Sequence, residues 1–221
     1  RIATVAAGGG SVCRIEMGRF VVGPESAGAV PGPACYRRGG PLTLTDCNVI
    51  LGKIQPEHFP AVFGLDADQP LDRAAAEAAM DTVLADFPGM SRAEAAEGFV
   101  AIGVAAMANA IKSVSLRRGH DPARAAIVSF GGAGGQHACR VADALGVATV
   151  IVHPLASVLS AYGMGLARLT AMREATLAIA LDDARLAASV NPLSAELRRE
   201  LGEPAQGLGP VTIKAVTNAW A

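Results

Sequence analysis

The chain has 221 residues, of which 51% are hydrophobic and 18% are charged, so it can bury a core and is not intrinsically disordered. Its 19 basic and 20 acidic residues nearly balance, which excludes a broad positive surface for nucleic acid or an anionic membrane. Small molecules or other protein chains are the expected partners.

The first 64 residues are rich in glycine and proline and predict short strands joined by loops. Apolar runs at 2–7, 19–22 and 42–45 lie between turn residues, as is typical of strands. The chain opens at Arg1, without a methionine and directly before the first of these runs. This opening predicts further sequence before Arg1.

Two helices are predicted next. Asp72 is a suitable N-cap for an alanine-rich helix that reaches about residue 87. Ser91 caps a second helix, with Glu94 at the capping-box position three residues on, and this helix extends to about Arg118. Its middle is apolar on almost every side, so we expect it to be buried.

No membrane span or signal peptide is predicted, because the longest apolar run, 99–111, is shorter than the roughly 20 residues that a bilayer requires. Four scattered cysteines form no CxxC pair and indicate reduced, mostly buried thiols in a cytoplasmic protein. Two disulfides remain the alternative. The cysteines are Cys13, Cys35, Cys47 and Cys139.

The second half of the chain has a βαβ pattern. An apolar strand at 125–130 leads into a glycine-rich loop, a helix at 136–145 and another strand at 149–152. This order favours a parallel or mixed sheet with helices on its faces.

The C-terminal part is predicted to be mostly helical from about residue 160 to about residue 201. A break is expected at Asn191-Pro192, because proline interrupts helices. The run 211–216 has strand character but no predictable place in the fold.

The clearest candidate binding motif is the glycine-rich loop between the strand at 125–130 and the helix after it. Glycines let the backbone approach a ligand, and a following helix N-terminus offers free N–H groups to an anion or a nucleotide. A tight turn without a ligand is an equally good interpretation, because the spacing is that of neither a P-loop nor a dinucleotide fold. The candidate cofactor-binding residues are Gly131, Gly132, Ala133, Gly134, Gly135, Gln136 and His137.

Two loops near the N-terminus are candidates for a substrate or ligand. A glycine cluster follows the first apolar run and allows a close ligand approach, although a hairpin or bulge explains it equally well. The loop at 23–36 is rich in glycine and proline, like many loops that line active sites. The candidate ligand residues are Gly8, Gly9, Gly10, Ser11, Glu25 and Ser26.

Asp46 and Asn48 carry oxygen ligands that suit Mg²⁺ or a polar substrate. Their alternative role, which the sequence by itself favours, is to cap a helix that begins at about Val49. The histidines form no pair with metal-ligand spacing, so the sequence indicates no histidine metal site and leaves the metal ligands unknown.

Seven stretches in the same order resemble the hydantoinase A and 5-oxoprolinase family over the chain to about residue 185. The Gly-Gly-Gln-His form of the glycine loop is typical of the 5-oxoprolinase side of that family. The matching stretches are 4–11, 22–29, 31–36, 45–46, 118–122, 130–138 and 159–163.

The resemblance implies an α/β fold: part of an actin-like, sugar-kinase-like ATPase of ribonuclease-H-like lobes, with a mixed sheet and flanking helices. Residues 1–185 would form the partial ATPase core and 186–221 a helical C-terminal segment. The implied reaction uses ATP and Mg²⁺ to open 5-oxoproline to glutamate. Hydantoin is the alternative substrate, and an N-methylhydantoinase or ketone carboxylase subunit is the alternative assignment.

Roles for the candidate residues also follow from the resemblance. The loop at 131–137 would bind the adenosine side of ATP, Asp46 would be catalytic, and the family's two phosphate loops would precede Arg1. A hydantoinase B-type subunit and further copies of the chain are the implied protein partners.

Five positions depart from the family pattern, and four of them replace a polar side chain with an apolar one. A catalytically inactive paralogue, serving as a binding or assembly module, is therefore a competing hypothesis. If one lost polar pocket explains the changes, the four apolar positions lie together. The departures are Ala3, Val30, Val104, Ala105 and Arg168.

Overall fold

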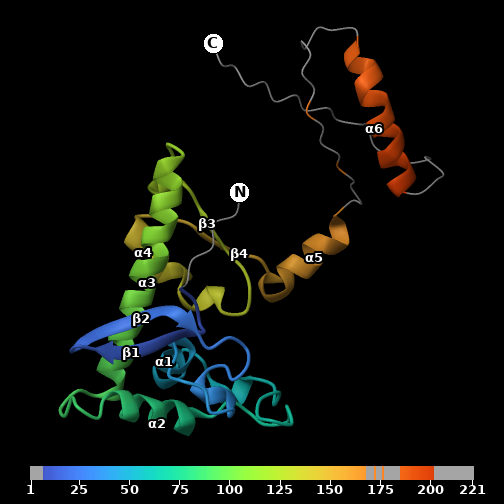
Figure 1. Cartoon of the computed structure of the whole chain (residues 1–221). Helices are drawn as coiled ribbons and strands as arrows, with labels where there is room; N and C mark the ends of the chain where they lie inside the picture. The colour runs from blue at the N-terminus through green and yellow to red at the C-terminus, as the bar shows by residue number, and fades with distance from the viewer. Residues whose placement is uncertain (1–6, 168–171, 173–175, 177–184, 202–221) are drawn as a thin grey trace. The chain divides into compact units, whose positions relative to one another are not determined.

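The computed structural model describes residues 7–167, 172, 176 and 185–201, and it divides the chain into two units, 1–162 and 163–221. This division falls earlier than the boundary predicted at residue 185. In the first unit the long helix α3 (Arg92–Arg117) has α1 (Leu44–Ile50), α2 (Arg73–Val83) and a β-hairpin toward its N-terminal end. Strands β3 (Ile127–Ser129) and β4 (Val150–Val152) lie toward its C-terminal end (Figure 1).

Strands β1 (Ser11–Glu16) and β2 (Arg19–Ser26) form an antiparallel hairpin. Its turn is Met17-Gly18, where both residues have positive φ, of 48° and 73°. Of this hairpin only the first half of β2 was predicted from the sequence. Strand β1 was not predicted, because the charged Arg14 and Glu16 interrupt its apolar pattern. The glycine cluster at 8–10 precedes this hairpin, and the ladder is irregular at Ser11.

Helix α1 (Leu44–Ile50) begins where the sequence predicted a strand. Thr43 is its N-cap and Asp46 stands at the third helical position, so the two form a capping box. The predicted strand at 42–45 is therefore wrong, as is a helix start at Val49. Thr43 keeps one strand-like contact, a β-bridge to Val12.

The predicted caps of the next two helices are confirmed. Asp72 accepts a hydrogen bond from the backbone of Ala75 at the start of α2 (Arg73–Val83), which ends earlier than residue 87. Ser91 and Glu94 form the capping box of α3 (Arg92–Arg117). Gly119, with φ of +73°, follows its end.

Helix α3 is buried along its N-terminal half and not throughout, which corrects the prediction. Its buried residues extend no further than Ala108, because α1, β2 and α4 (Ala138–Leu145) cover that part. The helix is long and apolar enough to cross a membrane by length and composition, which counting only the run 99–111 did not indicate. Its N-terminal half packs against three elements of the first unit.

Strands β3 (Ile127–Ser129) and β4 (Val150–Val152) pair in parallel, joined by α4 (Ala138–Leu145). The predicted βαβ unit is thus confirmed, with shorter strands than predicted. In the described part of the chain the strands form two separate two-stranded sheets instead of one mixed sheet. The architecture is α/β, as predicted.

The core joins side chains from α1, α2, the N-terminal half of α3, and α4. Its largest fully buried apolar side chains are Leu44, Met80, Val49, Phe99 and Val100. All four cysteines are free, as predicted, and all except Cys139 are buried.

Short 3-10 helices and two further α-helices complete the described chain. Pro192 lies inside α6, so the predicted helix break is wrong. Proline removes one backbone N–H, but the residues that follow it have high helix propensity and the helix continues. The runs at 2–6 and 211–216 lie outside the described residues. The remaining elements are η1 (Ala34–Tyr36), η2 (Pro56–His58), η3 (Pro122–Arg124), η4 (Gly134–Gln136), η5 (Ala156–Val158), α5 (Leu159–Leu166) and α6 (Arg185–Leu201).

Candidate functional site

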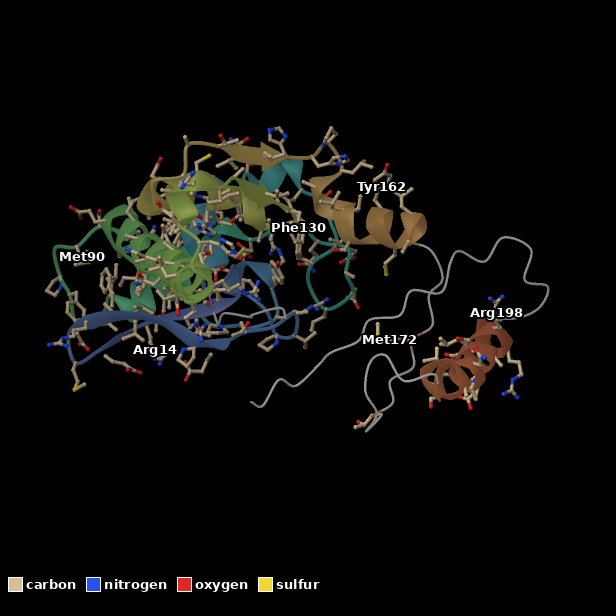
Figure 2. All side chains as sticks on the ribbon, turned by 90° about the horizontal axis from the view of Figure 1, so that it is seen from above. Arg14, Met90, Phe130, Tyr162, Met172 and Arg198 are labelled. Carbon is tan, nitrogen blue, oxygen red and sulfur yellow. The ribbon has the colours of Figure 1, made fainter. Side chains whose placement is uncertain are left out.

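The glycine-rich loop leaves the carboxyl end of β3, as predicted. Phe130, labelled in Figure 2, follows the strand, and residues 131–135 are all exposed. Gly131 has φ of +86°, which favours glycine, and its N–H donates to the carbonyl of Ala156 at 2.8 Å. The backbone of this loop is therefore anchored at its start and accessible along its length.

A cavity of about 350 Å³ lies beside the loop. Its walls come from β3, the exposed half of α3 and the start of α4, and they are mainly apolar. Open α/β sheets bind ligands at this position, outside the carboxyl ends of their strands. The lining residues are Ala7, Met107, Ile111, Ile127, Ser129, Phe130, Gly134, His137, Ala138 and Val141.

Helix α4 begins at Ala138, not at Gln136 as predicted, because residues 134–136 form the 3-10 turn η4. No side chain caps this helix, so its first N–H groups have no side-chain partner. Both His137 and Ala138 line the cavity. The arrangement suits a polar or anionic ligand at the helix N-terminus.

A buried polar contact joins this loop to α1. The Nδ2 of Asn48 donates to Oε1 of Gln136 at 2.6 Å and lies 3.3 Å from Nε2 of His137. Burial lowers the pKa of His137 below its ordinary value, and the positive charges of Lys53 and Arg140 lower it further. The ring is therefore neutral at pH 7.

The first glycine cluster lies against the same helix. The N–H and the hydroxyl of Thr45 both donate to the carbonyl of Gly9, at 2.9 and 3.0 Å. A Cβ on Gly9 would stand 2.7 Å from Oγ1 of Thr45 and 3.6 Å from Cβ of Ala133, so the two glycine loops are neighbours. Helix α1 thus holds one glycine loop through Thr45 and the other through Asn48.

Of the other candidate ligand residues, Ser26 joins this region and Glu25 does not. A Cβ on Gly10 would lie 2.9 Å from Oγ of Ser26, and the N–H of Ala27 donates to the carbonyl of Gly10. Glu25 forms an exposed ion pair with Arg14 at 2.7 Å on the hairpin. Neighbouring residues of a strand face opposite sides, which explains the difference.

The carboxylate of Asp46 is fully buried and satisfied by four donors. Its Oδ1 accepts from the N–H of Cys35 at 2.8 Å, and its Oδ2 accepts from the N–H groups of Ala34 and Thr43 and from the Thr43 hydroxyl. The prediction that Asp46 and Asn48 cap a helix beginning at about Val49 is therefore wrong: Asp46 does take part in a capping box, but as the third residue of α1, whose N-cap is Thr43. Asp46 also fastens the loop at 31–36 to α1. A direct catalytic role for Asp46 stays a prediction. In that role the carboxylate would have to exchange some of these hydrogen bonds for contacts with the substrate.

Among the described residues no group of three or more histidine, cysteine, aspartate or glutamate side chains is placed to hold a metal ion. Three donors engage Oδ2 of Asp46 and one engages Oδ1. The Mg²⁺ implied by the family resemblance thus stays a prediction, and no step below depends on it.

The positions that depart from the family pattern do not share one environment. Val30 is 76% exposed in a loop, Val104 is buried in the core, and Ala105 is exposed on α3. Ala3 and Arg168 lie outside the described residues. The single-pocket hypothesis is therefore not supported, because none of the three described positions lines the cavity.

Thr45 and the wall residues of α3 were not identified from the sequence. Met107 and Ile111 are four residues apart, the spacing of one helix face, which was a usable signal. Thr45 lies in the family-matching stretch 45–46, but its contact could not be predicted because its partner Gly9 lies 36 residues away.

Most of the chain matches a known protein family. The hydantoinase/oxoprolinase family model matches residues 1–173. The 5-oxoprolinase PfmaA of Pestalotiopsis fici is 49% identical over 173 residues, which is 76% of this chain and 14% of the relative.

Two solved structures have a similar fold. A nucleotide-free structure of acetone carboxylase, an enzyme of ATP-dependent acetone carboxylation, superposes with a TM-score of 0.73 at 27% identity, over 90% of this chain and 30% of that chain. The ATP-dependent caprolactamase of Pseudomonas jessenii gives 0.63 at 36% identity, over 88% and 28%. The chain thus spans under a third of each of these three proteins.

Proposed function

Because the chain belongs to the hydantoinase/oxoprolinase family, we propose that it forms part of an ATP-dependent cyclic amide hydrolase. The observation that carries the proposal is the cavity at the carboxyl end of β3, bordered by the exposed glycine loop and the uncapped start of α4. The proposed reaction is that of a 5-oxoprolinase: 5-oxoproline, ATP and water give glutamate, ADP and phosphate.

In this proposal the loop at 131–137 contacts the nucleotide. Its exposed glycines let the ligand reach backbone N–H groups, and the apolar walls formed by Met107, Ile111 and Phe130 accommodate the flat base. The N–H groups at the start of α4, which no side chain caps, favour polar atoms of the ligand. The cavity volume is within the range of small-molecule sites.

The substrate side is proposed at the first glycine cluster, residues 8–11, together with Ser26. Thr45 holds this cluster beside Ala133, so a ligand bound there would lie next to the nucleotide loop. A small cyclic amide is the proposed occupant. A hydantoinase B-type subunit and further copies of the chain are the proposed partners.

The ketone carboxylase alternative is supported only by similarity of fold. Of the three relatives named above, the 5-oxoprolinase shares the most identity with this chain and acetone carboxylase the least. Because one fold carries several reactions, sequence identity is the better guide here. The departures at Val30, Val104 and Ala105 keep the inactive paralogue as a competing hypothesis, although none of these residues lines the cavity.

We expect the isolated 221-residue chain to bind ATP weakly and to release no phosphate above background. Phosphoryl transfer requires loops that hold the β- and γ-phosphates, and the family's phosphate loops are expected before Arg1. The remaining contacts should supply millimolar affinity, about 4 kcal/mol. Calorimetry and a phosphate-release assay, each with and without 5-oxoproline and Mg²⁺, measure both quantities.

Two results of these assays would contradict the prediction. Phosphate release that depends on 5-oxoproline, from this chain alone, would show that the missing loops are not needed. Absence of any ATP binding at millimolar concentrations would contradict the nucleotide site itself.

Replacing Gly132 with valine should weaken ATP binding about tenfold, or by about 1.4 kcal/mol, while leaving the fold intact. Gly132 is exposed, a Cβ added to it would meet no atom within 4 Å, and its backbone is not in the left-handed conformation. The free energy of unfolding should thus change by less than about 0.5 kcal/mol. NMR titration with ATP and urea denaturation measure the two effects.

The matched control is Ala148→Val, which adds similar bulk at an exposed position before β4. It should alter neither ATP binding nor stability. Equal ATP affinity of Gly132→Val and the unchanged chain would place the nucleotide elsewhere.

A further inference from the structure

Two buried polar atoms lack a partner among the described residues, and both belong to the contact between α1 and the glycine loop. They are Oδ1 of Asn48 and Nδ1 of His137. Asn48 is fully buried and His137 is only 4% exposed. Buried polar groups are nearly always hydrogen-bonded, so an arrangement that leaves two of them unpaired requires an explanation.

The hydrogen-bonding capacity of the neighbouring groups determines how the Asn48 amide is oriented. With Nδ2 toward Gln136 and His137, both amide hydrogens find acceptors and only a carbonyl oxygen is unpaired. The reversed amide would bury two N–H donors without acceptors, which is the less favourable arrangement.

This orientation also determines the tautomer of His137. The second Nδ2 hydrogen of Asn48 points to Nε2 of His137, 3.3 Å away, so Nε2 must be the unprotonated acceptor. A neutral imidazole then carries its proton on Nδ1. The buried Nδ1–H is a donor for which the described residues supply no acceptor.

We infer that Asn48 is a positioning residue for nucleotide binding: it holds the end of the glycine loop through Gln136 and keeps the His137 proton on Nδ1. The inference rests on the proposed nucleotide site and adds a residue that acts through another. His137 is one of the residues that line the cavity, so through it Asn48 positions part of the wall of the proposed nucleotide site.

The charges around the ring favour this neutral form. Lys53, in the loop after α1, and Arg140, on α4, both disfavour a second proton on His137. Glu97 of α3 pairs with Arg140 at 2.8 Å and with Lys53 at 3.9 Å, so part of their charge is balanced. A carboxylate at position 48 would add a negative charge directly beside Nε2.

The test is Asn48→Asp in the 221-residue chain, followed by NMR of the imidazole nitrogens without nucleotide. A carboxylate only accepts hydrogen bonds, so the His137 proton should move to Nε2 and the pKa of the ring should rise. Asn109→Asp makes the same change on the exposed side of α3 and should leave His137 as it was. An unchanged tautomer in Asn48→Asp, or a proton on Nε2 in the unsubstituted chain, would overturn the inference.

An ATP titration separates this inference from the proposed function. ATP should shift the His137 signals of the unsubstituted chain and of Asn109→Asp, and its affinity for Asn48→Asp should be about tenfold lower. If Asn48→Asp does not fold, Asn48→Ala serves instead: it should give a mixture of tautomers and the same loss. If all variants bind ATP with equal affinity, the role of Asn48 is overturned. If the unsubstituted chain shows no response to ATP, the nucleotide site is contradicted, but the result on the His137 tautomer still stands.

Discussion

Replacing Asp46 with alanine should lower the free energy of unfolding by about 3–5 kcal/mol, the largest effect expected of any polar side chain described above. The substitution removes the acceptor of three buried N–H groups, those of Ala34, Cys35 and Thr43. Each unsatisfied buried donor costs about 1–3 kcal/mol, and the N-cap of α1 is weakened as well. Urea denaturation followed by circular dichroism measures the loss.

Asp143→Ala is the matched control, because it removes an exposed carboxylate from α4. Its effect should stay within about 0.5 kcal/mol. Asp46→Asn retains one carbonyl oxygen and should be destabilised less than Asp46→Ala. If Asp46→Ala is as stable as the unsubstituted chain, Asp46 does not support the fold, and the predicted catalytic role becomes the better explanation of its place.

Gly40→Ala should destabilise the chain by more than about 3 kcal/mol and should disturb the loop that Asp46 fastens. A Cβ at this position would lie 1.7 Å from the carbonyl oxygen of Gly32 and 3.2 Å from the carbonyl carbon of Pro33. Both obstacles are backbone atoms, so no side-chain rotation relieves the clash. Thermal unfolding of the variant measures the loss of stability.

Gly8→Ala provides the comparison, because a Cβ on Gly8 has no atom within 4 Å and its φ is not left-handed. That variant should unfold within about 0.5 kcal/mol of the unsubstituted chain. Equal stability of Gly40→Ala and Gly8→Ala would mean that the loop at 31–41 does not adopt the close backbone approach seen here.

Much of the secondary structure was predictable because its signals are local. The caps at Asp72 and Ser91 and the end of α3 before Gly119 depend on side chains within one helical turn. The pairing of β3 with β4 follows from the βαβ order, because such crossovers produce parallel strands. These predictions required no knowledge of the rest of the fold.

The error at α1 came from weighing two local signals wrongly. The run at 42–45 has the composition of a short strand, but Thr43 and Asp46 also have the spacing of a capping box. The helix prevails because its apolar residues Leu44 and Val49 enter the core against α3, and this burial depends on tertiary packing. Asp46 then becomes an interior residue, so its carboxylate is buried among backbone donors.

The sequence by itself determined the family resemblance, the α/β class and the two glycine loops as candidate sites. Only the tertiary structure decided that Asn48 hydrogen-bonds to a loop 88 residues further along the chain and that Thr45 brings the two glycine loops together. It also decided that Glu25 pairs with Arg14 on the hairpin and does not join these loops. The reason is physical: caps and turns are satisfied by neighbours in sequence, whereas these contacts exist only after α1, α3 and α4 have packed. Which polar groups meet in that core, and which are left without a partner, is a property of the packed chain.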